Sequence, residues 1–242
     1  MTDELDPATA LDERRRADAH VMLGEGRAAD LDVDLIELDE AADHHLVRVR
    51  RLRDDATVTV TDGAGRWRVT RLAGTGSGSA SLVASSDVRV AAAHAPFTLA
   101  SAVPKGDRLD WMVQKVTECG ADRIVLMECE RSVVRWKPER AAKQLARLQR
   151  IADEAAQQSR RVHRAIVEGP VPAAEVLPTA AVADPGGVAV GAEHRVLGIG
   201  PEGGWSDAEW GMISLRVHLA DTILRTETAA VVGTALCVVA DG

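Results

Sequence analysis

Long apolar runs are missing from this 242-residue sequence. No stretch approaches the roughly 18 consecutive apolar residues that a membrane-spanning helix needs. The longest candidate, residues 229–240, is too short, and we expect it to be a buried final helix. The N-terminal residues carry many charges and no apolar signal-peptide core. We therefore expect a cytoplasmic protein without a membrane partner.

Cysteine is also scarce. Cys119, Cys129 and Cys237 are odd in number and scattered, and they show none of the short spacings of a metal site. We expect three buried thiols and no bound metal. Lysine is nearly as rare, with only four residues, so arginine supplies most of the positive charge.

The charge is unevenly distributed along the chain. The formal net charge is −8, yet residues 1–45 alone hold fourteen Asp and Glu against four Arg. The rest of the chain balances at +2, and residues 131–164 within it balance at +7. A locally basic segment in an acidic protein is typical of phosphate contact on one face, although charge alone slightly favours a solvated helix face.

Strand signals dominate the first part of the chain. Residues 57–61 are rich in β-branched side chains, and residues 66–72 alternate between apolar and polar. The intervening Asp62-Gly63 dipeptide is a strong hairpin turn signal. These patterns predict a small β-rich domain over residues 18–92, preceded by a loose acidic leader over residues 1–17.

The pattern changes after residue 92. Apolar residues repeat at helical spacing over 109–116, where Gly120 is placed to end the helix, and again over 141–155. Short apolar strands alternate with these helices. The alternation predicts an α/β domain with a mostly parallel sheet over residues 93–242.

The most informative segment is LGIGPEGGWS, residues 197–206. It is an apolar strand that ends in a glycine-rich loop, and glycine lets the backbone approach a ligand closely. Ser206 and Glu209 form the pattern of a capping box, so a helix is expected directly after the loop. A strand end, a glycine loop and a helix start are typical parts of a small-molecule pocket.

Two other interpretations of this loop compete. Residues 198–203 fit a dinucleotide fingerprint, with Asp221 near the expected acidic position, which would indicate an oxidoreductase. We expect too few strands after this loop for a mononucleotide-binding fold. A glycine-rich turn without a ligand is the second alternative.

A second motif, LRTETAA, follows at residues 224–230. Together with IGPEGGWSDAEW, it resembles the RsmE family, which methylates N3 of a uridine in small-subunit (16S) ribosomal RNA and belongs to the SPOUT superfamily of knotted S-adenosylmethionine enzymes. Other segments are similar to the same family, from about residue 20 to the end: residues 44–49, 62–65, 105–120, 130–134 and 154–159.

The resemblance implies a PUA-like, RNA-binding barrel followed by a SPOUT-type methyltransferase domain with a C-terminal trefoil knot. In that knot the segment from about residue 219 passes through the loop near 197–204, and Thr226 caps the last helix. It also implies a homodimer, an S-adenosyl-L-methionine cofactor, and 16S ribosomal RNA or the small ribosomal subunit as the partner in ribosome biogenesis. A non-catalytic RNA-binding factor of the same fold remains an alternative.

The resemblance further implies a cofactor pocket with little side-chain bulk and open peptide groups, suited to an adenosyl group. The residues implied are Leu197, Gly198, Ile199, Gly200, Pro201, Glu202, Gly203, Gly204, Leu219, Leu224, Arg225 and Thr228. The loop at 184–187 is expected to close the pocket. The sequence departs from the family pattern at Ala220 and Thr222, where a glycine and an arginine are usual.

The acceptor requires separate chemistry. N3 of uracil carries a proton and is a poor nucleophile until that proton leaves, so a base or anion-stabilising groups are needed. Arg225 is expected to orient the base and stabilise negative charge. Glu227 and Glu202 are candidate proton acceptors, with a helix N-terminal carboxylate or a loop brace as the alternative. Arg131 is expected to reach the acceptor or its phosphate, with a surface ion pair as the alternative.

RNA contacts are expected from arginines in both domains: Arg48, Arg51, Arg131, Arg135 and Arg161. His44 and His45 are expected on a strand, where adjacent side chains point to opposite faces, so a shared metal is not expected.

Overall fold

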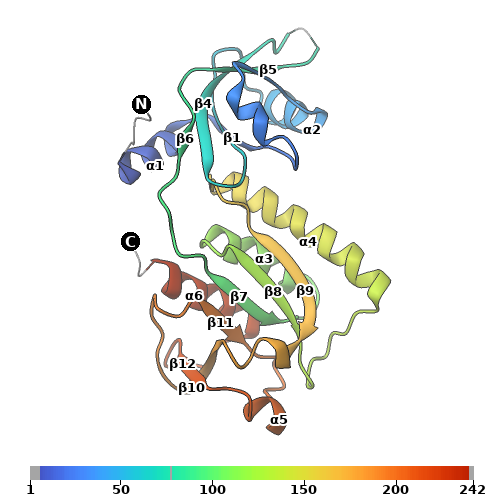
Figure 1. Cartoon of the computed structure of the whole chain (residues 1–242). Coiled ribbons are helices and arrows are strands. Elements are labelled where there is room, and N and C mark those ends of the chain that lie inside the picture. Colours follow the sequence, from blue (N-terminus) through green and yellow to red (C-terminus); the bar gives the residue numbers. More distant parts are fainter. Residues whose placement is uncertain (1–5, 77, 240–242) are drawn as a thin grey trace. The chain divides into compact units, whose positions relative to one another are not determined.

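The computed structural model describes residues 6–76 and 78–239 (Figure 1). The chain divides into two units. Unit 1 takes the residues up to His94 together with Ala156–Arg164, and unit 2 takes Ala95–Ala155 and the chain from Ala165 onward.

Unit 1 is built on a mostly antiparallel six-stranded sheet with the order β1-β3-β4-β5-β2, to which β6 adds beside β4. Only β1 and β3 pair in parallel. The strands are β1 (Ala19–Met22), β2 (Leu35–Glu37), β3 (Thr57–Thr61), β4 (Arg66–Ala73), β5 (Ser81–Ala84) and β6 (Arg89–Val90). The expected hairpin joins β3 to β4, and Gly63 there has a φ of 76°. The prediction of a β-rich first part is confirmed.

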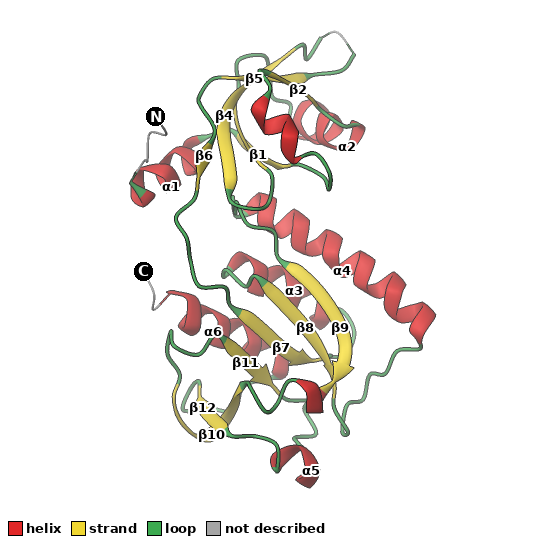
Figure 2. Ribbon diagram, viewed as in Figure 1, coloured by secondary structure: helices red, strands yellow, loops and turns green. Residues whose placement is uncertain are grey.

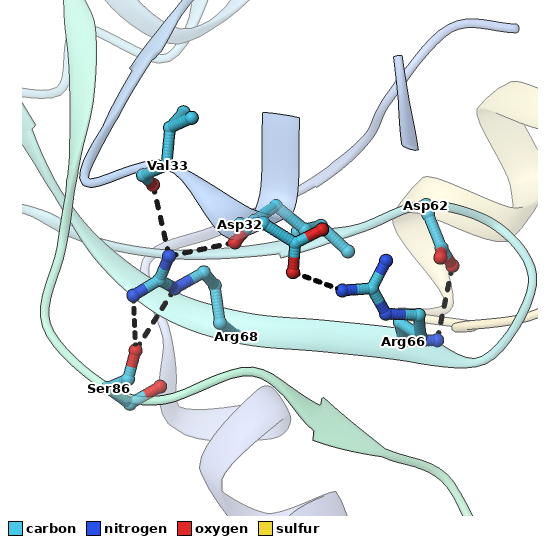
Figure 3. Close-up of polar contacts among 7 residues, drawn as sticks. Asp32, Val33, Asp62, Arg66, Arg68 and Ser86 are labelled. Atoms are coloured by element: carbon cyan, nitrogen blue, oxygen red, sulfur yellow. Dashed lines mark hydrogen bonds and ion pairs between the residues drawn. The ribbon is translucent and has the colours of Figure 1, made fainter. Parts of the chain in front are cut away.

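Arg68 on β4 is a buried cation in this unit (Figure 3). Its guanidinium donates hydrogen bonds to the carbonyl oxygens of Leu31, Val33 and Ser86 at 2.7–3.0 Å. Burying a charge is costly unless its donors find acceptors. Arg68 therefore fastens the 3-10 turn η1 (Ala28–Asp32) and the chain after β5 to the sheet.

Two expectations for unit 1 are wrong. Residues 7–16, expected to be loose, form helix α1 (Pro7–Arg16), which begins where Asp6 accepts a hydrogen bond from Thr9 N. Arg14 of α1 lies 5.0 Å from the ring centroid of the buried Trp67, so a cation–π contact secures the helix. His44 and His45 do not lie on a strand. They follow α2 (Glu40–Asp43) in a π-helical segment, His44–Val49, and both are exposed.

Residues 156–164 also belong to unit 1, which a boundary near residue 92 does not anticipate. Thr61 donates a hydrogen bond to the carbonyl of Val162, and Arg164 N donates to the carbonyl of Gly63. The ring of His20 lies between Thr59 Oγ1 (2.8 Å) and the carbonyl of Arg161 (2.9 Å). Burial lowers the pKa of His20 to about 4.

Unit 2 contains a parallel six-stranded sheet with the order β12-β10-β11-β7-β8-β9. The strands are β7 (Thr98–Ala102), β8 (Arg123–Glu128), β9 (Ile166–Pro172), β10 (Ala181–Ala189), β11 (Val196–Ile199) and β12 (Leu215–His218). The helices are α3 (Arg108–Glu118), α4 (Pro138–Gln158, of which residues 156–158 belong to unit 1), α5 (Asp207–Trp210) and α6 (Thr226–Val239), with a short turn η3 (Ala173–Glu175). The predicted parallel α/β architecture is confirmed.

Helices α3 and α6 lie along one face of this sheet (Figure 2), and each face of the sheet carries a cluster of buried apolar residues. Along β8, Ile124 and Leu126 enter a core shared with α3, α4 and α6, whereas Val125 and Met127 enter a second core with Trp205. Apolar residues at successive strand positions are what a doubly covered parallel sheet requires.

The cysteines lie in this unit as free thiols. Cys129 and Cys237 are buried as expected, and burial raises the pKa of these thiols to about 12 and about 11. Cys119 is only half-buried, contrary to the expectation. In the described part of the chain, no helix has the length and apolar character to cross a membrane, and no cluster of three His, Cys, Asp or Glu is arranged to hold a metal.

Candidate functional site

A cavity of about 550 Å³ lies in unit 2 where the two sequence motifs meet. Its walls come from the loop after β11, from the segment leading into α6 and from the bend at residues 183–185 of β10, with Arg131, Trp205 and Trp210 at the border. Most residues of 199–204 and 219–226 therefore line one cavity, although a helix and a strand separate the two segments in the sequence.

Position 200 in the glycine loop has no room for a side chain. A Cβ atom at this position would lie 2.8 Å from Cε2 of Trp205, closer than real contacts allow. Trp205 is buried beneath the loop and leaves no room for a side chain. Gly204 has a φ of 70° and donates its N–H to the carbonyl of Pro201 at 2.9 Å, which closes the turn.

A hydrogen bond joins the two motifs directly. Thr226, the first residue of α6, is buried and donates its hydroxyl to the carbonyl of Gly200 at 3.0 Å. Further along α6, a Cβ on Gly233 would lie 2.3 Å from Cδ2 of Leu197. The start of α6 is therefore packed closely against the end of β11.

Most residues implied for the cofactor line the cavity. They are Ile199, Gly200, Pro201, Glu202, Gly204, Leu219, Leu224 and Arg225. Four others do not line it, namely Leu197, Gly198, Gly203 and Thr228. Leu197 is fully buried in the core, Gly198 faces Val182, and Gly203 faces Arg131. Leu197 and Gly198 belong to strand β11 and Thr228 to α6, so of the four only Gly203 is part of the loop itself.

The structure adds lining residues that the pocket implied by the sequence lacks. They are Ala183, Trp205, Trp210, Ala220, Thr222, Ile223, Thr226 and Ala229. Residues 184–187, expected to be a loop, lie instead within strand β10, and Asp184 and Pro185 of this segment also line the cavity. The two departures from the family pattern, Ala220 and Thr222, therefore lie at the cavity itself.

Three of the four residues expected to act on the acceptor border the cavity: Arg131, Glu202 and Arg225. Glu227 does not. It is buried in the first turn of α6, and its Oε2 has no hydrogen-bond partner among the described residues. Its other oxygen, Oε1, lies 3.6 Å from Nε of Arg108.

Arg108, at the start of α3, is a residue that the sequence analysis missed. Its Nη1 lies 3.8 Å from Oε1 of Glu202, so one guanidinium lies between the carboxylates of the two motifs. Its position within a segment similar to the family, residues 105–120, is the only sequence signal that points to it.

The arginines expected to contact RNA fall in both units. Arg131 and Arg135 follow β8 in unit 2, and Arg135 donates to the carbonyl of Glu130 at 3.1 Å. Arg48 and Arg51 are exposed in unit 1, and Arg161 is half-buried there, donating to the carbonyl of His163.

Comparison with known families gives two matches. Residues 92–238 match a family described as an RNA methyltransferase domain, and residues 38–84 match one described as an RNA methyltransferase PUA domain. The two matches lie in the two parts of the chain that the sequence patterns separate.

Two similar proteins carry the same name. The chain is 32% identical over 222 residues to the ribosomal RNA small subunit methyltransferase E of Synechocystis sp., covering 83% of this chain and 71% of the relative. It is 28% identical over 221 residues to the protein of that name from Mycobacterium tuberculosis, covering 83% and 84%.

A solved structure agrees with these relatives. The ribosomal RNA small subunit methyltransferase E from Neisseria gonorrhoeae, bound to S-adenosyl methionine, is 27% identical to this chain. It superposes with a TM-score of 0.76 over 90% of this chain and 95% of its own. The RNA methyltransferase family matches more than half of this chain, and the Synechocystis relative aligns with 83% of it. This chain therefore belongs to the RsmE family of RNA methyltransferases.

Proposed function

We propose that this protein transfers a methyl group from S-adenosylmethionine to N3 of a uridine in small-subunit (16S) ribosomal RNA. The observation that carries this proposal is the cavity lined by residues of both segments, 199–204 and 219–226. The N. gonorrhoeae relative, bound to S-adenosyl methionine, supports the cofactor, and the relatives named ribosomal RNA small subunit methyltransferase E support the RNA substrate.

The cavity fits a nucleoside cofactor in size and lining. Its volume of about 550 Å³ is in the usual range for small-molecule pockets. Ile199, Leu219 and Leu224 offer apolar walls for an adenine ring, and the backbone around Gly200 is free of side-chain bulk. We infer that these residues hold the adenosyl group.

When bound, S-adenosylmethionine supplies an activated methyl group and its own leaving group, so the protein mainly aligns the two reactants. Arg225 borders the cavity and is exposed, so it is free to orient the uracil and stabilise the anion that forms when N3 loses its proton. Glu202 borders the same cavity and is the better placed proton acceptor. Glu227 is buried and acts through its contact with Arg108.

We propose that RNA is bound by Arg131 and Arg135 beside the cavity and by Arg48, Arg51 and Arg161 in the PUA-like unit.

We further propose a cytoplasmic homodimer, and a trefoil knot in which the segment from about residue 219 passes through the loop at 197–204. The close packing of Gly233 against Leu197 and the bond from Thr226 to Gly200 support the proposed path of the chain.

Calorimetry tests the cofactor, and a transfer assay tests the reaction. The purified protein should bind S-adenosylmethionine and not NAD, which separates a methyltransferase from a dinucleotide-dependent oxidoreductase. It should also transfer labelled methyl groups to small ribosomal subunits from cells that lack this enzyme. Binding of the cofactor without transfer to RNA or to subunits would favour the non-catalytic RNA-binding factor.

A further inference from the structure

A buried carboxylate lies behind the wall of the cavity. Glu209, on the short helix α5, is almost fully buried, at 4% exposure. Its Oε2 accepts a hydrogen bond from Ser206 N at 2.8 Å, which is half of the capping box that starts α5. Its Oε1 accepts a second bond, from Glu130 N, also at 2.8 Å.

The second bond joins α5 to a distant part of the chain. A capping box needs only the reciprocal bonds between Ser206 and Glu209. Glu130 is 79 positions away in the sequence, in the turn that follows β8. One carboxylate therefore connects the segment directly after the glycine loop to the turn that carries Arg131.

The turn itself is held tightly at both ends. Cys129 N donates to Ser132 Oγ at 3.1 Å, and Ser132 N donates to the carbonyl of Cys129 at 3.0 Å. A Cβ on Gly203 would lie 3.3 Å from both the Cβ and the carbonyl oxygen of Arg131. The backbone of the turn therefore lies directly against the glycine loop.

The side chain of Arg131 is held much less firmly than its backbone. It is exposed, borders the cavity, and makes no ion pair among the described residues. Its one hydrogen bond is a long contact of 3.5 Å from Nη1 to the carbonyl of Gly203. The place from which this guanidinium reaches into the cavity is therefore set by the turn, and Glu209 is bonded to that turn at Glu130 N.

We propose that Glu209 is a positioning residue for methyl transfer, because it fixes the Arg131 turn against the glycine loop and so places a cation where the RNA acceptor enters. This inference rests on the proposed function, since it assumes that Arg131 meets RNA. The carboxylate is required because both of its oxygens accept from backbone N–H groups, whereas an amide has only one acceptor oxygen.

Four variants separate positioning from capping: Glu209→Gln, Ser206→Ala, Arg131→Ala and the double variant Glu209→Gln/Arg131→Ala. Ser206→Ala removes the hydroxyl that accepts from Glu209 N at 3.1 Å and leaves the bond to Glu130 intact, so it is the control for helix capping. Each variant is measured for S-adenosylmethionine affinity, for kcat/KM on small ribosomal subunits, and for thermal unfolding.

Glu209→Gln should lower kcat/KM for RNA by about 10-fold or more, because Arg131 no longer holds the RNA acceptor in the right place. It should change cofactor affinity by less than about 3-fold, because the glycine loop that binds the cofactor keeps its conformation. Arg131→Ala should give a similar loss. The double variant should have a kcat/KM within about 2-fold of that of Arg131→Ala alone, because Glu209 acts only through the side chain that Arg131→Ala has already removed. Ser206→Ala should lower the unfolding temperature and largely keep kcat/KM.

Hydrogen exchange of the peptide around residues 129–132 gives a readout that does not need activity. Glu209→Gln should speed exchange there, and Ser206→Ala should not. Independent, multiplying losses in the double variant, or equal losses for Glu209→Gln and Ser206→Ala, would overturn the proposal. If the wild-type protein transfers no methyl group to RNA, the proposed function fails, and the exchange data still decide whether Glu209 holds the turn.

Discussion

Nε of Arg108 lies 3.6 Å from Oε1 of the buried Glu227, at the point where α3 and α6 begin. The same guanidinium lies 3.8 Å from Glu202 in the glycine loop. The two sequence motifs therefore share a cation that belongs to neither of them. Glu202 and Glu227 are the two candidate proton acceptors, so Arg108 is placed to influence both.

Replacing Arg108 should affect activity more than stability. Arg108→Gln should slow methyl transfer by about 10-fold, because the charge that orients both carboxylates is lost. The side chain of Arg108 is 45% exposed and its contacts with Glu202 and the buried Glu227 are long, at 3.8 and 3.6 Å, so we expect a loss of only about 1 kcal/mol in unfolding free energy. Lys105→Gln, at an exposed cation three residues before Arg108 and outside α3, is the control. An Arg108→Gln protein with full activity would remove the residue from the mechanism.

Arg225 should act on the reaction rather than on the cofactor. Arg225→Ala should reduce turnover by about 100-fold, as loss of an anion-stabilising donor does, with little change in S-adenosylmethionine affinity. Arg225→Lys keeps the charge and loses the planar fork, so it should recover only part of the rate. Single-turnover kinetics and calorimetry check both quantities, and equal losses in rate and affinity would count against an acceptor role.

Gly200 should tolerate no side chain. Gly200→Ala places a methyl group 2.8 Å from the ring of the buried Trp205, so the loop must move away and distort the cavity. We expect a loss of about 1–3 kcal/mol in unfolding free energy, together with weaker cofactor binding. Gly211→Ala is the matched control, because its Cβ would meet atoms no nearer than 3.5 Å. Denaturant unfolding and calorimetry on both variants test this, and a Gly200→Ala protein that matches the control in both would contradict it.

The stability of the protein should fall in mild acid because of His20. Burial lowers the pKa of His20 to about 4 from an ordinary value of 6.5, so below pH 6.5 the unfolded chain takes up a proton that the folded chain does not. This contribution is fully present above pH 6.5. It is lost as the pH falls from 6.5 toward 4, which lowers the free energy of unfolding by about 3 kcal/mol over that pH range.

The comparison of His20→Gln with wild type isolates this effect in urea unfolding between pH 7 and pH 4. The variant should show a flatter pH dependence, because it has no imidazole to protonate. His45→Gln, at an exposed histidine, should keep the wild-type profile. A His20→Gln profile as steep as that of wild type would show that other groups dominate the acid sensitivity.

The fold was predictable where the pattern is local. Apolar strands alternating with amphipathic helices indicate a parallel α/β sheet, and Asp62-Gly63 marks the β3–β4 hairpin. The loop at 197–204 and the segment at 219–228 were expected to meet, and residues from both line one cavity. Close packing explains the need for glycine at position 200.

What could not be predicted depends on contacts distant in the sequence. Helix α1 is secured by Arg14 over Trp67, and residues 156–164 join unit 1 through the partners of His20 and Thr61. Arg108 contacts Glu227 only because the fold brings the starts of α3 and α6 together. None of these contacts leaves a periodicity or a spacing in the chain.

The most direct test of the proposed function is to map the methylated nucleotides of small-subunit ribosomal RNA from cells with and without this protein. We expect one N3-methyluridine to disappear in the deletion strain, to return with the wild-type protein, and not to return with Arg225→Ala. A small-subunit RNA whose N3-methyluridine is unchanged by the deletion would contradict it.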